Sequence, residues 1–142
     1  MAFQEKSAWV MMFVLLIAGL FYINSMLSIE ANVPAEAGKV ALVPIFGVYV
    51  AIVVITSIIG QIAIAIFSPN EASSDLDERD ELISAKAGNL SGMALGAGIV
   101  GSLLSYLWFQ NGIWLFHAAF LSLMASALVE YGLKVFYYRR GY

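Results

Sequence analysis

The chain consists of long apolar runs separated by short polar stretches. Each run has at least about 20 residues, the length that an α-helix needs to cross the hydrocarbon core of a bilayer. Because a helix satisfies its own backbone hydrogen bonds in lipid, even the run rich in isoleucine and valine is expected to be helical. The pattern predicts an all-α polytopic membrane protein with four transmembrane helices in an up-down bundle. The predicted spans are residues 8–28, 40–67, 83–109 and 113–135.

The stretches between the runs contain turn and helix-breaking residues. Residues 29–39 include Pro34 and predict a short polar connection, after which Pro44 is expected in the first turns of the second helix. Pro69 marks the end of that helix. The Gln110-Asn111-Gly112 turn is so short that the third and fourth helices are expected to be antiparallel neighbours, so the whole chain reads as one four-helix domain.

The third helix is expected to begin in an acidic segment outside the membrane. Residues 75–86 read DLDERDELISAK and continue without a break into the apolar run. Ser74 or Asp75 is the expected N-cap, and the acidic side chains suit the positive end of the helix dipole. Asp75 and Arg79 have the spacing of an i,i+4 ion pair. We therefore expect one amphipathic rod that extends the third helix into the cytoplasm.

The membrane part of the third helix divides into three faces at 3.6 residues per turn. Two faces consist of small residues, which let helix backbones approach closely in lipid, and the third is large and apolar, as expected of a lipid-facing side. The longer small face holds Ala87, Ser91, Ala94, Gly98, Gly101, Ser102 and Ser105, and its extension reaches Leu76 and Ile83. The shorter holds Gly88, Gly92 and Gly96, and the apolar face holds Leu90, Met93, Val100, Leu104, Leu107 and Trp108.

The two small-residue faces predict two packing partners for the third helix. The first interpretation is that both faces pack against helices of this chain. The second is that one of them, carrying two overlapping G-x-x-x-G steps, forms a homodimer contact. The sequence alone leaves both open.

Composition supports a membrane protein and argues against several other classes. Hydrophobic residues make up 61% of the chain and charged residues 12%, far from a soluble composition. The seven basic residues form no patch beyond Arg139-Arg140, so nucleic-acid binding is not expected. The lack of cysteine removes disulfides, thiolate nucleophiles and Cys-ligated metals.

The distribution of basic residues predicts the orientation in the membrane. Lys39 is the one basic residue in the first and third loops, and six lie on the opposite face. We therefore expect an inner-membrane protein with both termini and the acidic segment in the cytoplasm. The six are Lys6, Arg79, Lys86, Lys134, Arg139 and Arg140.

Few titratable residues fall within the predicted spans. His117 is the single histidine and has no acidic or cysteine neighbour at ligand spacing, so we interpret it as a packed or interfacial residue, with a protonatable role as the alternative. Glu130 stands four residues before Lys134, in the order that favours an ion pair on one helix, and a titratable function is again the alternative. Ser57 and Gln61 are expected to form hydrogen bonds between helices.

Asp80 is predicted to meet basic residues at the cytoplasmic face. It lies near the packed side of the third helix, and Lys134, Arg139 and Arg140 are the basic groups expected at the same level. This placement predicts a salt-bridge cluster between the third and fourth helices.

Asp77–Ile83, which reads DERDELI, followed by Lys86-Ala87, resembles a motif in small four-helix membrane proteins of bacteria and archaea, a family without an established function. Some members are encoded beside small helix-turn-helix regulators, so the resemblance implies a regulatory or sensing role and transfers no catalytic residue. Small multidrug-resistance transporters also have four helices, but they carry a carboxylate in the first helix. Residues 8–28 contain none.

The sequence favours a non-enzymatic membrane module, either an accessory subunit or a regulator, that acts through helix packing and its acidic helix. No nucleophile–base pair or multi-ligand cluster indicates an enzyme, and no cofactor or metal is expected. The expected partners are membrane lipids and a second copy or a larger complex. The alternative is a small homodimeric transporter or channel, for which His117 and Glu130 are the titratable candidates.

Overall fold

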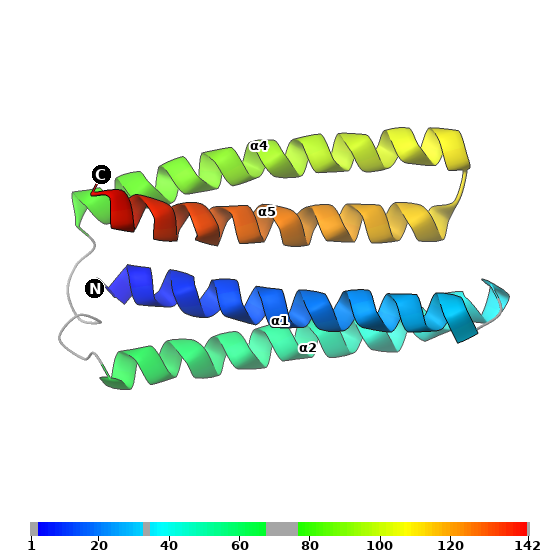
Figure 1. Ribbon diagram of the computed structural model, residues 1–142, viewed down its shortest axis with the longest axis horizontal. Helices are drawn as coiled ribbons and strands as arrows, with labels where there is room; N and C mark the ends of the chain where they lie inside the picture. Colours follow the sequence, from blue (N-terminus) through cyan, green and yellow to red (C-terminus); the bar gives the residue numbers. More distant parts are fainter. Residues whose placement is uncertain (1–2, 33–34, 68–76, 142) are drawn as a thin grey trace.

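The computed structural model describes residues 3–32, 35–67 and 77–141, and nearly all of them are helical (Figure 1). Within these ranges there are four helices and no strand. They are α1 (Phe3–Asn32), α2 (Ala35–Phe67), α4 (Glu78–Phe109) and α5 (Gly112–Arg140). Each has 29 to 33 residues and is therefore roughly 45 Å long. All four are long and apolar enough to cross a membrane, which confirms the predicted all-α, multi-pass class.

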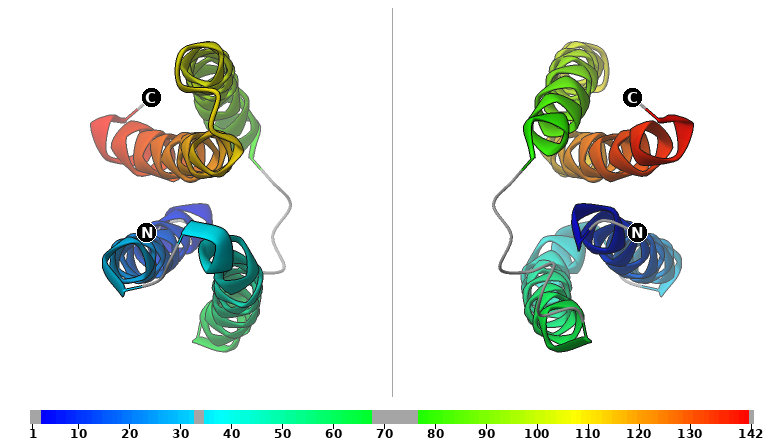
Figure 2. Two further views of the ribbon diagram at one scale, coloured as in Figure 1. Left: turned by 90° about the vertical axis from the view of Figure 1, so that its right-hand side faces the viewer. Right: turned by 90° about the vertical axis from the view of Figure 1, so that its left-hand side faces the viewer.

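The helices are arranged as two pairs. α1 packs on α2, α4 packs on α5, and the two pairs meet where α1 contacts α5 (Figure 2). Both chain ends lie at one end of the molecule, here called the terminal end, and the α4–α5 turn lies at the other, the turn end (Figure 1). Because α1 and α5 occupy the middle, α2 and α4 each leave a broad side uncovered by the described chain.

Helices α1 and α2 extend beyond the predicted spans. α1 continues to Asn32 and α2 begins at Ala35, so the predicted polar connection of residues 29–39 is mostly helical. Glutamate and alanine, which are frequent in this stretch, are good helix formers wherever the chain leaves lipid. In consequence Pro44 lies inside α2 instead of in its first turns. A membrane helix tolerates the backbone hydrogen bond that a proline in its interior removes.

The acidic start of α4 differs in detail from the prediction. The helix begins at Glu78 with Asp77 as its N-cap residue, and the side chain of Asp77 makes no capping hydrogen bond. Its carbonyl oxygen instead accepts from the backbone N–H of Asp80 at 2.8 Å. The predicted caps, Ser74 and Asp75, lie outside the described residues, so the predicted pair of Asp75 with Arg79 stays a prediction.

The turn between α4 and α5 explains why these helices lie side by side. Gln110 has a left-handed backbone (φ 50°), and its N–H donates to the carbonyl oxygen of Tyr106 at 2.7 Å. The side chain of Asn111 then caps α5, accepting from the N–H groups of Ile113 at 3.0 Å and Trp114 at 3.2 Å. Two residues thus reverse the chain and close both helix ends.

An aromatic cluster joins α1, α2 and α5. Tyr22 is 1% exposed and its ring lies 4.5 Å from that of Phe120, centroid to centroid. The ring of Tyr49 lies 4.9 Å from Phe120 in an edge-on arrangement. Phe46 and Phe116 add two more edge-on contacts. These contacts connect the two helix pairs through ring packing, which favours offset and edge-on geometry.

Candidate functional site

α4 packs on α5 through part of the predicted longer small face. Ser126 of α5 donates its hydroxyl to the backbone carbonyl of Ser91 at 2.9 Å, so the backbones lie close together there. The buried members of the face are Ala87, Ser91 and Ser102, with Ile83 buried on its extension. Ala94 and Gly101, which were assigned to the same face, are exposed, and Ser105 is half-buried. The predicted extension to Leu76 lies outside the described residues.

Three glycines lie at close approaches between helices of this chain. At Gly19, Gly60 and Gly98 an added Cβ would stand 2.5 to 2.7 Å from an atom of a neighbouring helix. The obstructing atoms are Cε of Met124 for Gly19, Cγ1 of Val10 for Gly60, and Cβ and Oγ of Ser122 for Gly98. Any larger residue at these positions requires the neighbour to move. Two of these glycines, in α1 and α2, were missed from the sequence because they stand alone and form no repeating pattern.

The shorter small face of α4 has no partner in the described chain. An added Cβ at Gly88, Gly92 or Gly96 would meet nothing within 4 Å. Gly92 and Gly96 are exposed and Gly88 is half-buried. The described residues thus offer no close neighbour that would account for these glycines, and the second interpretation, a homodimer contact, stays a prediction. We call Gly88, Gly92 and Gly96 the open glycine face.

The large apolar face of α4 is exposed as predicted. Its members range from 39% exposed at Leu90 to 87% at Trp108. α2 likewise exposes isoleucine and valine along most of its length. Surfaces of this kind suit lipid, since apolar side chains lose nothing by facing acyl chains.

His117 is buried and bonded to a tyrosine of another helix. Its Nδ1 atom lies 2.8 Å from the hydroxyl of Tyr22, and only 4% of the histidine is exposed. The imidazole ring also contacts Phe116, with 5.9 Å between centroids. His117 is thus part of the packed interior, and the Tyr22 partner lies 95 residues away in sequence.

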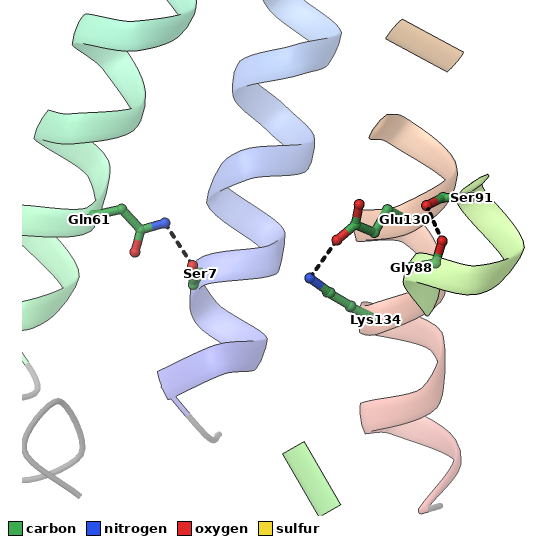
Figure 3. Close-up of polar contacts among 6 residues, drawn as sticks. All are labelled: Ser7, Gln61, Gly88, Ser91, Glu130 and Lys134. Carbon is green, nitrogen blue, oxygen red and sulfur yellow. Dashed lines mark hydrogen bonds and ion pairs between the residues drawn. The ribbon is translucent and has the colours of Figure 1, made fainter. Parts of the chain in front are cut away.

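The polar contacts in the half of the molecule near the termini include an ion pair within α5 and a hydrogen bond between α1 and α2 (Figure 3). Lys134 Nζ lies 2.7 Å from Oε1 of Glu130, so these residues form the i,i+4 pair that their order predicts. Gln61 of α2 donates from Nε2 to the hydroxyl of Ser7 in α1 at 2.7 Å. Both arrangements satisfy polar groups within the chain, as expected for polar residues in helix interfaces. Ser57 Oγ is buried without a hydrogen-bond partner among the described residues.

The acidic start of α4 is attached to α5 by a tyrosine. Tyr138 donates its hydroxyl to Oδ1 of Asp80 at 2.7 Å, and Arg79 approaches the carbonyl oxygen of Tyr138 at 3.4 Å. The predicted partner Arg139 lies elsewhere: its Nε is 3.9 Å from Oε1 of Glu5 in α1. The expected Asp80–arginine salt bridge is therefore replaced by a neutral donor.

The difference has a simple cause. Positions 138 and 139 are about 100° apart around α5, so they cannot both face α4. Tyr138 faces α4, and Arg139 faces α1, where it also lies over the ring of Trp9 at 5.3 Å. Glu5 is 9% exposed and was not identified as a partner from the sequence. Its position at the start of α1 does not indicate which basic residue of another helix would lie beside it.

The described residues offer packing surfaces and structural polar pairs. No three histidine or acidic side chains gather closely enough within them to hold a metal ion. Comparisons with protein-family models, curated proteins and solved structures each found no match. The open glycine face is a feature of α4 that no contact within the described residues explains.

Proposed function

We propose that this chain is a non-enzymatic multi-pass membrane module, an accessory or regulatory subunit that associates with other membrane helices through the open glycine face of α4. In this proposal the four helices cross the membrane as an up-down bundle. The first turns of α4 project from it as an acidic cytoplasmic extension.

The proposal is supported by a contrast between glycines of α4 that pack against a neighbouring helix and glycines that do not. Gly98 on α4 sits against Ser122, so the chain itself explains it. A Cβ added at Gly88, Gly92 or Gly96 would meet nothing within 4 Å among the described residues. A glycine in a helix costs about 1 kcal/mol relative to alanine. Three of them spaced by four residues on one face are most simply explained by a backbone that approaches from outside the described chain.

The orientation is supported by the basic residues. Six of the seven lie toward the terminal end, including Arg139 and Arg140 in the last turn of α5. Basic residues are retained on the cytoplasmic side of membranes. We therefore place both termini in the cytoplasm of a cell whose inner membrane holds the protein.

A homodimeric transporter or channel is the second candidate. The Glu130–Lys134 pair favours it, because the carboxylate is 32% exposed and its helix lies in the middle of the molecule. In a transporter this carboxylate would exchange its lysine partner for a substrate cation or a proton. Flux of a cation or of protons into proteoliposomes would establish this function in place of the first if Glu130→Gln abolished it.

The packing proposal is tested by Gly92→Leu, with Ala97→Leu as its matched control. Both substitutions place a leucine on an exposed part of α4, but Ala97 lies on the lipid-facing side, about 140° from Gly92. The measurement is the amount of associated protein, a second copy or another subunit, that survives mild-detergent extraction and is weighed by native mass spectrometry. We expect Gly92→Leu to remove it and Ala97→Leu to retain it. Equal association in both variants would refute the proposal.

A further inference from the structure

Two basic side chains near the terminal end lie on neighbouring aromatic rings. Lys86 Nζ of α4 is 5.2 Å from the ring centroid of Tyr137 in α5. Arg140 Cζ is 4.7 Å from the ring of Phe136, and the two rings are 5.8 Å apart. Lys86, Tyr137, Phe136 and Arg140 therefore form one continuous basic–aromatic patch that bridges both helices.

The patch stands where the apolar part of the bundle begins. Lys86 is the last charged residue of α4 before the apolar run that reaches Phe109, and Arg140 is the last residue of α5. Both basic residues are exposed, and Phe136 is 45% exposed. Lysine and arginine at such depths keep their stems along apolar surface and their charges at the headgroup level, and aromatic rings favour the same level.

Arg140 differs from its neighbour in what it contacts. Arg139 is directed toward Glu5, with 3.9 Å between Nε and Oε1. Arg140 forms no ion pair with a residue of the described ranges, and its guanidinium rests on the ring of Phe136. A guanidinium held on a ring retains donors that point outward and can accept an anion.

The acidic residues of α4 do not oppose an anion at this patch. Asp77 and Glu81 lie about 140° to 180° around the helix from Lys86, and Glu78 lies about 80° away. Asp80 accepts a hydrogen bond from Tyr138. The side of α4 that carries Lys86 also carries Arg79, two helical turns earlier.

We propose that the basic–aromatic patch binds the headgroup of an anionic phospholipid. The headgroup phosphate would meet the guanidinium of Arg140, which can bind phosphate oxygens in pairs, and Lys86 would add positive charge to the same patch. The acyl chains would follow the exposed apolar surface toward the turn end. This site is separate from the open glycine face, since Gly92 lies about 120° around α4 from Lys86.

The test uses the full chain in mild-detergent micelles with phosphatidylglycerol and phosphatidylcholine that have identical acyl chains. Native mass spectrometry counts the lipid molecules retained. We expect wild type to retain phosphatidylglycerol in excess, and Lys86→Gln or Arg140→Gln to lower this retention about five-fold each. Arg139→Gln removes the same charge one residue away and should change it by less than about two-fold. Equal retention of both lipids by wild type, or an equal loss in Arg139→Gln, overturns the proposal.

Two further experiments serve as controls. Charge-preserving variants distinguish a loss of lipid binding from a loss of folding, and competition with inorganic phosphate distinguishes a lipid site from a simple anion site. Lys86→Arg keeps the charge and should retain phosphatidylglycerol, whereas Arg140→Lys keeps the charge but loses the paired donors and should retain an intermediate amount. Loss of retention in both charge-preserving variants contradicts the site. An excess of inorganic phosphate should leave the lipid bound, because the acyl chains add to its affinity. Complete displacement by inorganic phosphate would show an anion site that is not a lipid site.

Discussion

The hydroxyl of Tyr22 lies 2.8 Å from Nδ1 of His117, and this hydrogen bond connects α1 to α5 inside the protein. Tyr22 is 1% exposed and His117 4%. α1 and α5 form the contact between the two helix pairs. The bond therefore fixes the rotation of one pair against the other at the aromatic cluster.

Removing either partner should weaken the contact between the pairs. Tyr22→Phe keeps the ring contacts with Tyr49 and Phe120 and removes only the hydroxyl. We expect Tyr22→Phe and His117→Leu to lower the free energy of unfolding in detergent, with a double-mutant coupling of about 1 kcal/mol. Tyr106→Phe, an exposed tyrosine of α4, should change it by less than about 0.5 kcal/mol. Additive effects of the two substitutions would contradict the bond.

Glycine-to-alanine substitutions should have opposite effects at Gly98 and Gly101, although both belong to the longer small face of α4. At Gly98 the new methyl group meets Cβ of Ser122 at 2.7 Å, so Gly98→Ala should destabilise the chain by about 1 to 3 kcal/mol. Gly101→Ala meets nothing within 4 Å and should stabilise the helix by up to about 1 kcal/mol. Thermal unfolding in one detergent measures both. A loss of stability in Gly101→Ala equal to that in Gly98→Ala would show that α4 is rotated relative to this structure.

The first turns of α4 should open more readily when Tyr138 loses its hydroxyl. Tyr138→Phe removes the donor to Asp80, a hydrogen bond to a charged acceptor at 2.7 Å. Amide hydrogen exchange over the first two turns of α4 should become faster by about five-fold, which corresponds to about 1 kcal/mol. The control is Tyr131→Phe, which lies in α5 like Tyr138 and should leave the exchange rates of these amides unchanged. Unchanged exchange in Tyr138→Phe would mean that other contacts hold the start of α4.

Charge reversal should identify Glu5 as the partner of Arg139. Glu5→Lys brings a second positive charge close to Arg139 and should lower stability by at least about 1 kcal/mol, because the side chain at position 5 is only 12% exposed. Arg139→Glu should restore it in the double variant. Asp80→Lys, in contrast, should not be rescued by Arg139→Glu. Rescue of Asp80→Lys in chemical denaturation would support the pairing predicted from the sequence instead.

The number of helices and the exposed side of α4 could be predicted because both depend on local sequence. Four uninterrupted apolar runs fix four helices, and side chains such as Met93 and Trp108 share one face through the helical period alone. The end of α1 was placed too early along the chain, and the start of α2 was placed too late. Hydropathy reports where lipid ends, whereas a helix continues into water when residues such as Glu30 and Glu36 favour it.

The contacts between distant helices could not be predicted for a different reason. The Tyr22–His117 bond and the Arg139–Glu5 pair depend on the relative rotation and depth of α1 and α5, which no local pattern specifies. The sequence located two small-residue faces on α4 but could not assign α5 to one of them. The positions of Ser122 and Ser126 decide that the face with Ser91 and Gly98 is the filled one.

In the proposed function, the open glycine face contacts another protein helix in the membrane. A photoreactive residue at Gly92, or at Ala97 as the control, can be activated in intact membranes and the adducts separated by mass. The account predicts a protein adduct from position 92, with a second copy or another subunit, and only lipid adducts from position 97. Lipid adducts alone from both positions would contradict it.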